Sequence, residues 1–262
     1  MSSLRTAARG GLAERAARLR ALHAETAGRP LVLPSVWDAA SARAAVAAGF
    51  PAVATASAAV AASLGRPDRE GVDVHRMLDA VGAIAAAVDV PVTADLESGY
   101  GLTATALVDG LLDVGAVGLN LEDSDHGAGG RLRSPAEQQA LLSAVRGAAD
   151  DSGIGVVLNG RCDLLLHADG DPGTRIDRTI ERLRGYAEAG ADVLYPIGSR
   201  DPADLRRLVD ALPRPVNAIA EPGDDLAALA ATGVRRITFG PYLQRATMAA
   251  MADLLAPWRR VA

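Results

Sequence analysis

The segment "PVTADLESGYGLTATALVDGLLDVGAVGLNLED", residues 91–123, contains one complete strand–helix–strand repeat. A short apolar run at 91–96 ends in acidic residues, and a second run at 117–123 ends in the same way. The residues between them have helical spacing and finish at "DVGA", where glycine ends the helix. The segment therefore predicts two strands joined by a helix, with carboxylates where each strand ends.

The same alternation continues in both directions along the chain. It predicts eight strands, at 31–37, 52–57, 91–96, 117–123, 155–163, 193–198, 215–220 and 235–241. Eight strands alternating with helices predict an α/β fold, a single (β/α)8 TIM-type barrel domain over residues 1–262 with an N-terminal helix at about 3–27. The alternative is a doubly wound open sheet, which often carries a G-x-G-x-x-G loop that this sequence lacks.

Composition excludes several classes of protein. The formal net charge is −5 in 262 residues, so we expect no nucleic-acid partner. No apolar run is long enough to cross a bilayer, so we expect no membrane partner, and a single cysteine fits a cytoplasmic location. All 27 positive side chains are arginine. Without lysine there is no amine for a Schiff base, which excludes a lysine-dependent aldolase.

Polar residues two positions apart close four consecutive strands. Alternate residues of a strand share one side, and catalytic groups of parallel barrels lie at the carboxyl ends of the strands. The pattern therefore predicts a polar site at one mouth of the barrel. The residues are Thr55 and Ser57, Asp95 and Glu97, Asn120 and Glu122, Asn159 and Arg161, with Asn217 near the end of the seventh strand.

The residue types indicate the chemistry of this site. Asp95, Glu97 and Glu122 offer hard oxygen ligands for Mg²⁺, with Mn²⁺ as an alternative. Arg161 can bind a substrate carboxylate through paired hydrogen bonds. Amides and hydroxyls at Asn120, Asn159, Thr55 and Ser57 can orient substrate oxygens. A cation beside a carboxylate-binding arginine predicts stabilisation of the enolate of a 2-oxo acid.

Several motifs together resemble the isocitrate lyase/phosphoenolpyruvate mutase superfamily from about residue 20 onward. They are "LPSVWDAASAR", "ATASAAVAASLGRPD", "TADLESGYG", "GLNLED", "NGRCD", "PVNAIAEPG" and "FGPYLQRA". The resemblance implies a barrel whose last helix packs on a neighbouring subunit, in a homodimer or homotetramer. It also implies an Mg²⁺ site that serves enolpyruvate-type intermediates.

The resemblance also assigns individual residues. Asp95 would be the main Mg²⁺-linked acid, with Glu97 and Glu122 as the second and third acids and many of their contacts through water. Asp68 in "LGRPD" would be the acid after strand two, and Arg161 the arginine that binds the substrate carboxylate. The segment from Thr55 to Ala59, including Ser57 and Ala58, would hold substrate oxygens through hydroxyl and backbone N–H groups.

The loop after strand four departs from the family pattern. The C–C lyases of this family carry a "KKCGH"-like loop with a catalytic cysteine, and the phosphonomutases begin it with "EDK". This chain has "LEDSDHGAGGRLRSPAEQ", residues 121–138, with neither Cys nor Lys. His126 in this loop is a candidate general acid or base, in competition with an ordinary exposed loop histidine. Cys162 should point into the helix layer and serve only in packing.

We therefore expect an Mg²⁺-dependent lyase or decarboxylase that acts on a small 2-oxo or 2-hydroxy carboxylate through an enolate. Phosphonomutase or phosphonopyruvate hydrolase chemistry at a phosphorus–carbon bond is the alternative within the fold. A catalytically weak barrel that binds a carboxylate is the alternative from another class.

Overall fold

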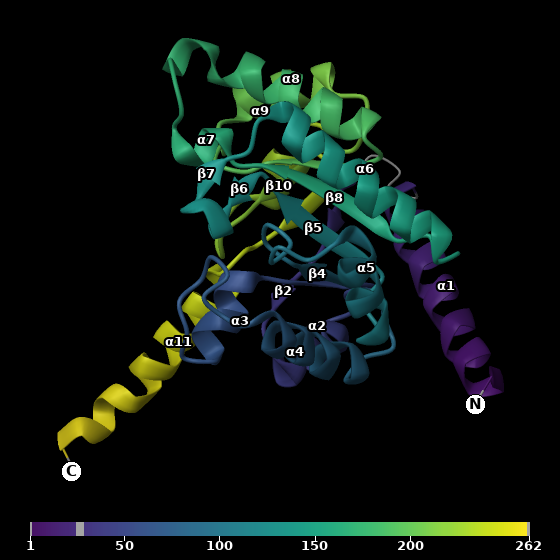
Figure 1. Cartoon of the computed structure of the whole chain (residues 1–262). Coiled ribbons are helices and arrows are strands. Elements are labelled where there is room, and N and C mark those ends of the chain that lie inside the picture. Colours follow the sequence, from purple (N-terminus) through teal and green to yellow (C-terminus); the bar gives the residue numbers. More distant parts are fainter. Residues whose placement is uncertain (1, 25–28, 261–262) are drawn as a thin grey trace.

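The computed structural model describes residues 2–24 and 29–260 (Figure 1). Short parallel strands occupy the centre of the molecule. Over these residues they are β1 (Leu31–Val32), β2 (Ser35–Val36), β3 (Val53–Thr55), β4 (Val92–Asp95), β5 (Gly118–Glu122), β8 (Val157–Cys162), β9 (Val193–Pro196), β10 (Asn217–Ile219) and β11 (Arg236–Thr238). Each of the eight predicted strand segments contains observed strand, so the parallel α/β class is confirmed.

The strands form a six-stranded sheet in the order β2-β3-β4-β5-β8-β9 and a three-stranded sheet in the order β1-β11-β10. A parallel bridge between Leu194 in β9 and Val216, just before β10, connects the two sheets on one side. On the other side the chain itself passes from β1 into β2. The predicted strand at 31–37 is thus divided, because Pro34 has no N–H for the ladder. Its carbonyl still accepts from the Ala54 N–H at 3.0 Å.

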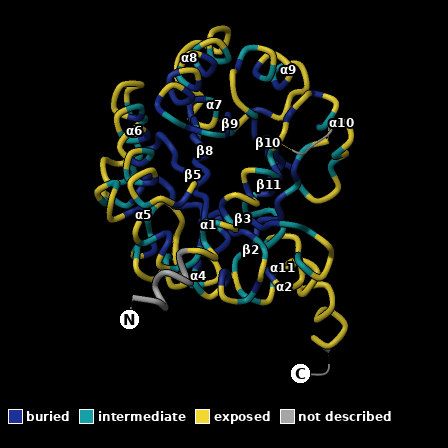
Figure 2. The backbone as a smooth tube through the Cα atoms, turned by 90° about the vertical axis from the view of Figure 1, so that its right-hand side faces the viewer, coloured by how far each residue is buried: buried dark blue, intermediate teal, exposed yellow. Residues whose placement is uncertain are grey.

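Helices surround the strands, and Figure 2 shows buried strands inside a ring of helices whose outer faces are exposed. The helices are α1 (Ser2–Ala24), α2 (Ala39–Ala47), α3 (Ser57–Ser63), α4 (Val74–Ala86), α5 (Ala104–Asp113), α6 (Pro135–Asp151), α7 (Leu164–His167), α8 (Arg175–Glu188), α9 (Pro202–Ala211), α10 (Leu226–Ala230) and α11 (Tyr242–Leu255). The first of them covers residues 3–24 of the predicted helix at 3–27, and residues 25–28 lie outside the described ranges. Among the described residues, no helix combines the length and the apolarity needed to span a bilayer.

Side-chain caps explain where several helices begin. The Asp73 carboxylate accepts from the His75 N–H at 2.9 Å and starts α4. Ser134 starts α6 through a capping box with Glu137, and Pro135 occupies the first turn, where its missing N–H costs nothing. Caps of this kind each stabilise a helix by about 1 kcal/mol.

The core lies between the strands and the helices. Leu119, Leu121 and Leu158 alternate with the polar residues of β5 and β8 and are fully buried. The helices contribute Ile84 and Leu142 to the same apolar cluster. Each such side chain stabilises the fold by roughly 1.5–3 kcal/mol relative to an exposed one. One side of each strand is thus committed to the core, which leaves the other side free for polar residues.

An antiparallel hairpin, absent from the sequence prediction, follows β5. It pairs β6 (Ser124–Asp125) with β7 (Arg131–Leu132) around the 3-10 helix η1 (His126–Ala128). Two further 3-10 helices are η2 (Pro172–Thr174) and η3 (Ala256–Arg260). The hairpin returns the chain over the carboxyl ends of the strands and thereby fixes where His126 lies.

Candidate active site

Two adjacent cavities open at the carboxyl ends of the strands. The first has a volume of about 310 Å³ and is lined by Glu97, Glu122, Ser124 and His126, among others. The second, of about 240 Å³, is lined by Thr55, Ala58, Asp95, Asn120 and Tyr195, among others. Both cavities share Ser57, Asp68, Arg161 and Leu166. The structure therefore brings most of the predicted site residues to one place.

Asp95 ends β4 and is held from one side. The N–H and hydroxyl of Ser57 donate to its Oδ2 at 3.2 and 3.0 Å. Its own N–H donates to the Thr55 hydroxyl oxygen at 2.9 Å. Its other oxygen, Oδ1, is buried and has no partner among the described residues. Burial raises the pKa of Asp95, and the Arg161 charge partly opposes this.

Arg161 lies between acidic side chains. Its Nη1 is 2.5 Å from Glu122 Oε2, and its Nε and Nη2 donate to Asp163 at 2.6 and 3.1 Å. Burial alone would lower the pKa of Arg161, but the surrounding carboxylates raise it well above its usual value. A guanidinium has five N–H donors, so those not used by Glu122 and Asp163 remain for a ligand in either cavity.

His126 lies beside two acids, Glu97 just after β4 and Glu122 at the end of β5. Its Nε2 lies 2.6 Å from Glu122 Oε1 and 3.9 Å from Glu97 Oε2, and its side chain is 8% exposed. The hairpin fixes this position, because the Asp125 carboxylate accepts from the Ala128 N–H at 3.2 Å. The alternative of an ordinary exposed loop histidine is therefore wrong. Burial raises the pKa of Glu122 well above its usual value, against the effect of Arg161.

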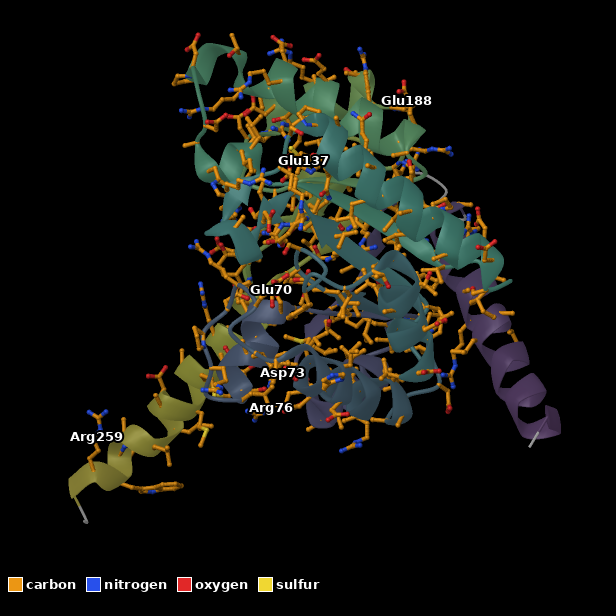
Figure 3. The ribbon with its side chains drawn as sticks, viewed as in Figure 1. Glu70, Asp73, Arg76, Glu137, Glu188 and Arg259 are labelled. Carbon is orange, nitrogen blue, oxygen red and sulfur yellow. The ribbon has the colours of Figure 1, made fainter. Side chains whose placement is uncertain are left out.

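The Gly-Tyr-Gly turn after β4 is bonded to the loop that carries Asp68. Glu70 accepts from the Ser98 hydroxyl at 2.5 Å and the Tyr100 N–H at 2.8 Å, and its own N–H donates to Glu97 at 2.5 Å. Arg69, Glu70, Glu97 and Tyr100 all have positive φ. Left-handed backbone at non-glycine residues stores strain and is common at functional sites. Figure 3 shows Glu70 on the side of the molecule that carries α3.

We expect Tyr100→Phe to destabilise the metal-free protein by about 1–2 kcal/mol at about pH 8 and by less at about pH 5. Burial raises the pKa of Glu97 to about 7, and the Tyr100 hydroxyl, which donates at 2.6 Å, partly opposes this. Without that donor the pKa rises further above its unfolded value of 4.5. Ionised Glu97 then costs more folding free energy as the pH rises.

Urea unfolding at the two pH values measures the effect. The control is Tyr242→Phe, because the Tyr242 hydroxyl has no hydrogen-bond partner among the described residues. A loss in Tyr100→Phe that is the same at both pH values would contradict the role given to Glu97.

Asp68 reaches the site from a tight turn after α3. It lines both cavities. Gly71 makes this turn possible, because a Cβ there would lie 2.5 Å from the Pro67 carbonyl oxygen. Any larger residue at 71 would displace the segment that carries Asp68.

Asn159 and Asn217 lie below the cavities and line neither of them. Both are fully buried. Asn159 Nδ2 donates to Asn120 Oδ1 at 2.8 Å, and Asn217 Nδ2 donates to the Thr238 hydroxyl at 3.0 Å. Of the three predicted asparagines, the structure brings only Asn120 to the cavity wall. Cys162 is fully buried, as expected, and burial raises the pKa of its thiol.

Several residues of the site were missed by the sequence analysis. Asp163 binds Arg161, and it also accepts from the Ser124 hydroxyl at 2.6 Å. Asp163 follows Arg161 by two positions, and Ser124 follows Glu122 by two. Extending the alternation by one more step along each strand would therefore have found both residues. A third missed residue is Arg236 in β11, whose Nη2 donates to Asn120 Oδ1 at 3.2 Å. It precedes Thr238, a cavity residue, by the same spacing.

The donor set fits a Mg²⁺ ion that has few direct protein ligands. The buried, unpartnered Asp95 Oδ1 is a hard oxygen of the kind that Mg²⁺ prefers. Glu97 and Glu122 already accept hydrogen bonds from Tyr100, Glu70, His126 and Arg161. Among the described residues, no three His, Cys, Asp or Glu side chains gather closely enough to hold a metal together. Asp95 would thus be the direct ligand, with the two glutamates acting through water.

A family model for phosphoenolpyruvate phosphomutase matches residues 19–257. The chain belongs to this family. An uncharacterized protein of Mycobacterium tuberculosis is 34% identical to this phosphomutase-family chain over 224 residues, which cover 82% of the chain and 80% of that protein. An oxaloacetate decarboxylase of Rhodopseudomonas palustris is 31% identical over 230 residues, covering 84% of the chain and 76% of the relative.

Solved structures agree with the family assignment. A Burkholderia cenocepacia protein, provisionally described as a phosphonomutase, is 41% identical with a TM-score of 0.85, over 93% of this chain and 99% of that one. Oxaloacetate acetylhydrolase with its product oxalate is 28% identical, with a TM-score of 0.81, over 94% of this chain and 86% of that one. Phosphonopyruvate hydrolase with oxalate and Mg²⁺ is 25% identical, with a TM-score of 0.81, over 94% of this chain and 87% of that one. The named relatives of this phosphomutase-family chain are lyases, decarboxylases, mutases and hydrolases, which supports an enzymatic role for it.

Proposed function

We propose that this protein is a Mg²⁺-dependent lyase or decarboxylase that acts on a small 2-oxo or 2-hydroxy carboxylate. The observation that carries the proposal is the unpartnered Asp95 Oδ1 in the same cavity as the Arg161 guanidinium. The Asp95 oxygen suits a cation, and the Arg161 guanidinium suits a carboxylate. Relatives crystallised with oxalate, one of them also with Mg²⁺, support this pairing.

Binding and orientation come from Arg161 and the start of α3. The N–H donors of Arg161 that remain free bind the substrate carboxylate, and Ser57 holds Asp95 in place. When bound, Mg²⁺ supplies Lewis-acid stabilisation of negative charge on the substrate's oxo oxygen. The hairpin and the Asp68 loop contribute His126 and Asp68 to the wall of the first cavity.

In a 2-oxo substrate, the bond that breaks joins the carbon next to the oxo group to its leaving group. In a decarboxylation the C3–carboxylate bond breaks, CO₂ leaves, and its electron pair forms the enolate of the remaining 2-oxo acid. His126, whose Nε2 lies 2.6 Å from Glu122 Oε1, is our candidate for delivering the proton that this carbon then takes up. Asp68 lines both cavities and would orient the leaving group or a water molecule bound beside it.

Turnover tests the proposal. The purified protein is offered oxaloacetate, substituted malates, methylisocitrate and phosphonopyruvate with Mg²⁺, while 2-oxo acid products are monitored. Release of pyruvate from oxaloacetate or a malate supports it, and turnover of phosphonopyruvate alone would favour phosphorus–carbon chemistry instead. Oxalate binding without any turnover would favour a binding protein. Failure to bind either Mg²⁺ or oxalate would overturn the site itself.

We also propose that the two sheets close into one (β/α)8 barrel and that α11 packs on a second copy of the chain. The bridge at Leu194–Val216 and the chain passage from β1 to β2 support closure. Figure 1 shows α11 extending away from the rest of the molecule. Its outer part and η3 expose five large apolar side chains: Met248, Met251, Leu254, Leu255 and Trp258. An exposed apolar stripe of this kind marks an association surface.

We expect Leu254→Asp to convert a wild-type dimer or tetramer into a monomer. The Leu254 side chain is 72% exposed and lies amid the apolar stripe, where a charge would have to be buried on association. Light scattering coupled to size-exclusion chromatography measures the mass. Asp253→Asn, on the same helix, removes a charge without removing apolar area and should leave the oligomer intact. A monomeric wild-type protein would contradict the packing proposed for α11.

A further inference from the structure

Arg236 is a fully buried cation without a carboxylate partner among the described residues. It lies in β11 and is 0% exposed. Its Nη2 donates to Asn120 Oδ1 at 3.2 Å, while its Nε and Nη1 have no partner. Burial lowers the pKa of Arg236 to about 10, so the guanidinium keeps its charge at neutral pH. A buried, incompletely bonded cation is unfavourable for folding, so its presence calls for a role other than stability.

The contact with Arg236 fixes the orientation of two amides. Arginine has only donors, so the Asn120 atom that faces it must be the carbonyl oxygen. Asn159 also approaches Asn120 Oδ1, at 2.8 Å, and must therefore present its Nδ2 group. The Asn159 Oδ1 is consequently turned away and has no partner. One guanidinium thus sets a chain of hydrogen bonds across three strands.

The other end of the Asn120 amide is left for the cavity. Asn120 lies in register with Asp95 on β4 and lines the second cavity beside it. Its Oδ1 is occupied by two donors. Its Nδ2 has no protein partner among the described residues and is not sealed in the interior. An N–H donor is therefore presented to the cavity that Asp95 also lines.

We propose that Arg236 is a positioning residue that holds the Asn120 amide with its Nδ2 directed at an oxygen of the bound carboxylate. This inference rests on the proposed function, because it assumes that a carboxylate or oxo oxygen lies beside Asp95. A hydroxyl or amide at position 236 could either donate or accept, which would permit both orientations of Asn120. Arginine permits one. The site then selects a ligand with an acceptor oxygen at this point and disfavours a donor group there.

A double-mutant cycle on oxalate binding tests the proposal. Isothermal titration with oxalate and Mg²⁺ is performed on the wild type, Arg236→Met, Asn120→Ala and the double variant. We expect Asn120→Ala to weaken oxalate binding about tenfold, the equivalent of one good hydrogen bond to an anion. Arg236→Met should weaken it about three- to tenfold. The double variant should bind no more weakly than Asn120→Ala, because Arg236 acts through Asn120.

Stability provides the readout that separates positioning from a structural role. Arg236→Met replaces a buried charge with an apolar side chain of similar length. The urea midpoint of this variant should therefore be unchanged or higher, while its oxalate binding falls. If Arg236→Met does not fold, Arg236→Gln replaces it in the same cycle. The glutamine amide can donate to Asn120 or accept from it, so both orientations of Asn120 become possible, and the loss of affinity should vanish in the Asn120→Ala background.

Two results would overturn the inference. One is wild-type oxalate affinity in folded Arg236→Met or Arg236→Gln. The other is a cycle in which the two losses multiply, since Arg236 would then act independently of Asn120. A wild-type protein that fails to bind oxalate would instead overturn the proposed function, so the two failures are distinguishable.

Discussion

Arg161→Met should lower turnover by at least about a thousandfold, close to 4 kcal/mol of transition-state stabilisation. The guanidinium lies between Glu122 and Asp163 and faces both cavities, so its loss removes the carboxylate-binding group. It also takes the arginine partner away from two buried acids, Glu122 and Asp163. Removing one partner of a buried ion pair typically costs about 3–5 kcal/mol of folding free energy.

The stability loss in Arg161→Met should grow with pH. Burial already raises the pKa of Glu122, and the Arg161 charge is the main opposing effect. Without it the folded-state pKa rises further, so the variant is least destabilised where Glu122 is protonated and most destabilised above that range. Steady-state kinetics and urea unfolding at about pH 5 and about pH 8 measure both effects. Arg161→Lys is the matched control, which keeps the charge but loses the paired donors. Wild-type kcat/KM in Arg161→Met would contradict the assignment.

The polar pairs could be predicted from sequence because alternation in a strand is a local property. Thr55, Ser57, Asp95, Asn120 and Glu122 follow the period of two and reach the cavities as expected. Depth within the sheet is not local. It depends on how far neighbouring strands are staggered, which no single strand's pattern records. Asn159 and Asn217 were therefore assigned to the right side of their strands but lie too deep to line a cavity.

The hairpin and Arg236 were missed for other physical reasons. Strands β6 and β7 have two residues each, too few to show an alternating pattern. An arginine in a strand ordinarily indicates a solvent-facing position, since buried arginines are rare unless paired. Arg236 contradicts that expectation because its partner, Asn120, lies 116 positions away on a strand of the other sheet. A long-range contact of this kind leaves no signal near either residue.

Asp95→Asn should make the protein more stable and less able to bind Mg²⁺. Burial raises the pKa of Asp95, so the folded state favours the neutral acid and ionisation costs folding free energy as the pH rises above the unfolded value of 3.8. An asparagine has no such cost. Urea unfolding of the metal-free protein should show a gain of about 1–2 kcal/mol at about pH 8 and a smaller gain at about pH 5.

Binding should change in the opposite direction. Ser57 donates twice to Asp95 Oδ2, so an asparagine at 95 would turn its carbonyl oxygen toward Ser57. Its Nδ2 group would then replace the unpartnered Oδ1, which presents a donor where a cation requires an oxygen. We expect Mg²⁺-dependent oxalate binding to weaken at least about a hundredfold, or 2.8 kcal/mol. Ser57→Ala, which leaves Oδ1 in place, should lose far less. Asp95→Asn protein that is still stabilised against heat by Mg²⁺ would show that Asp95 is not the ligand.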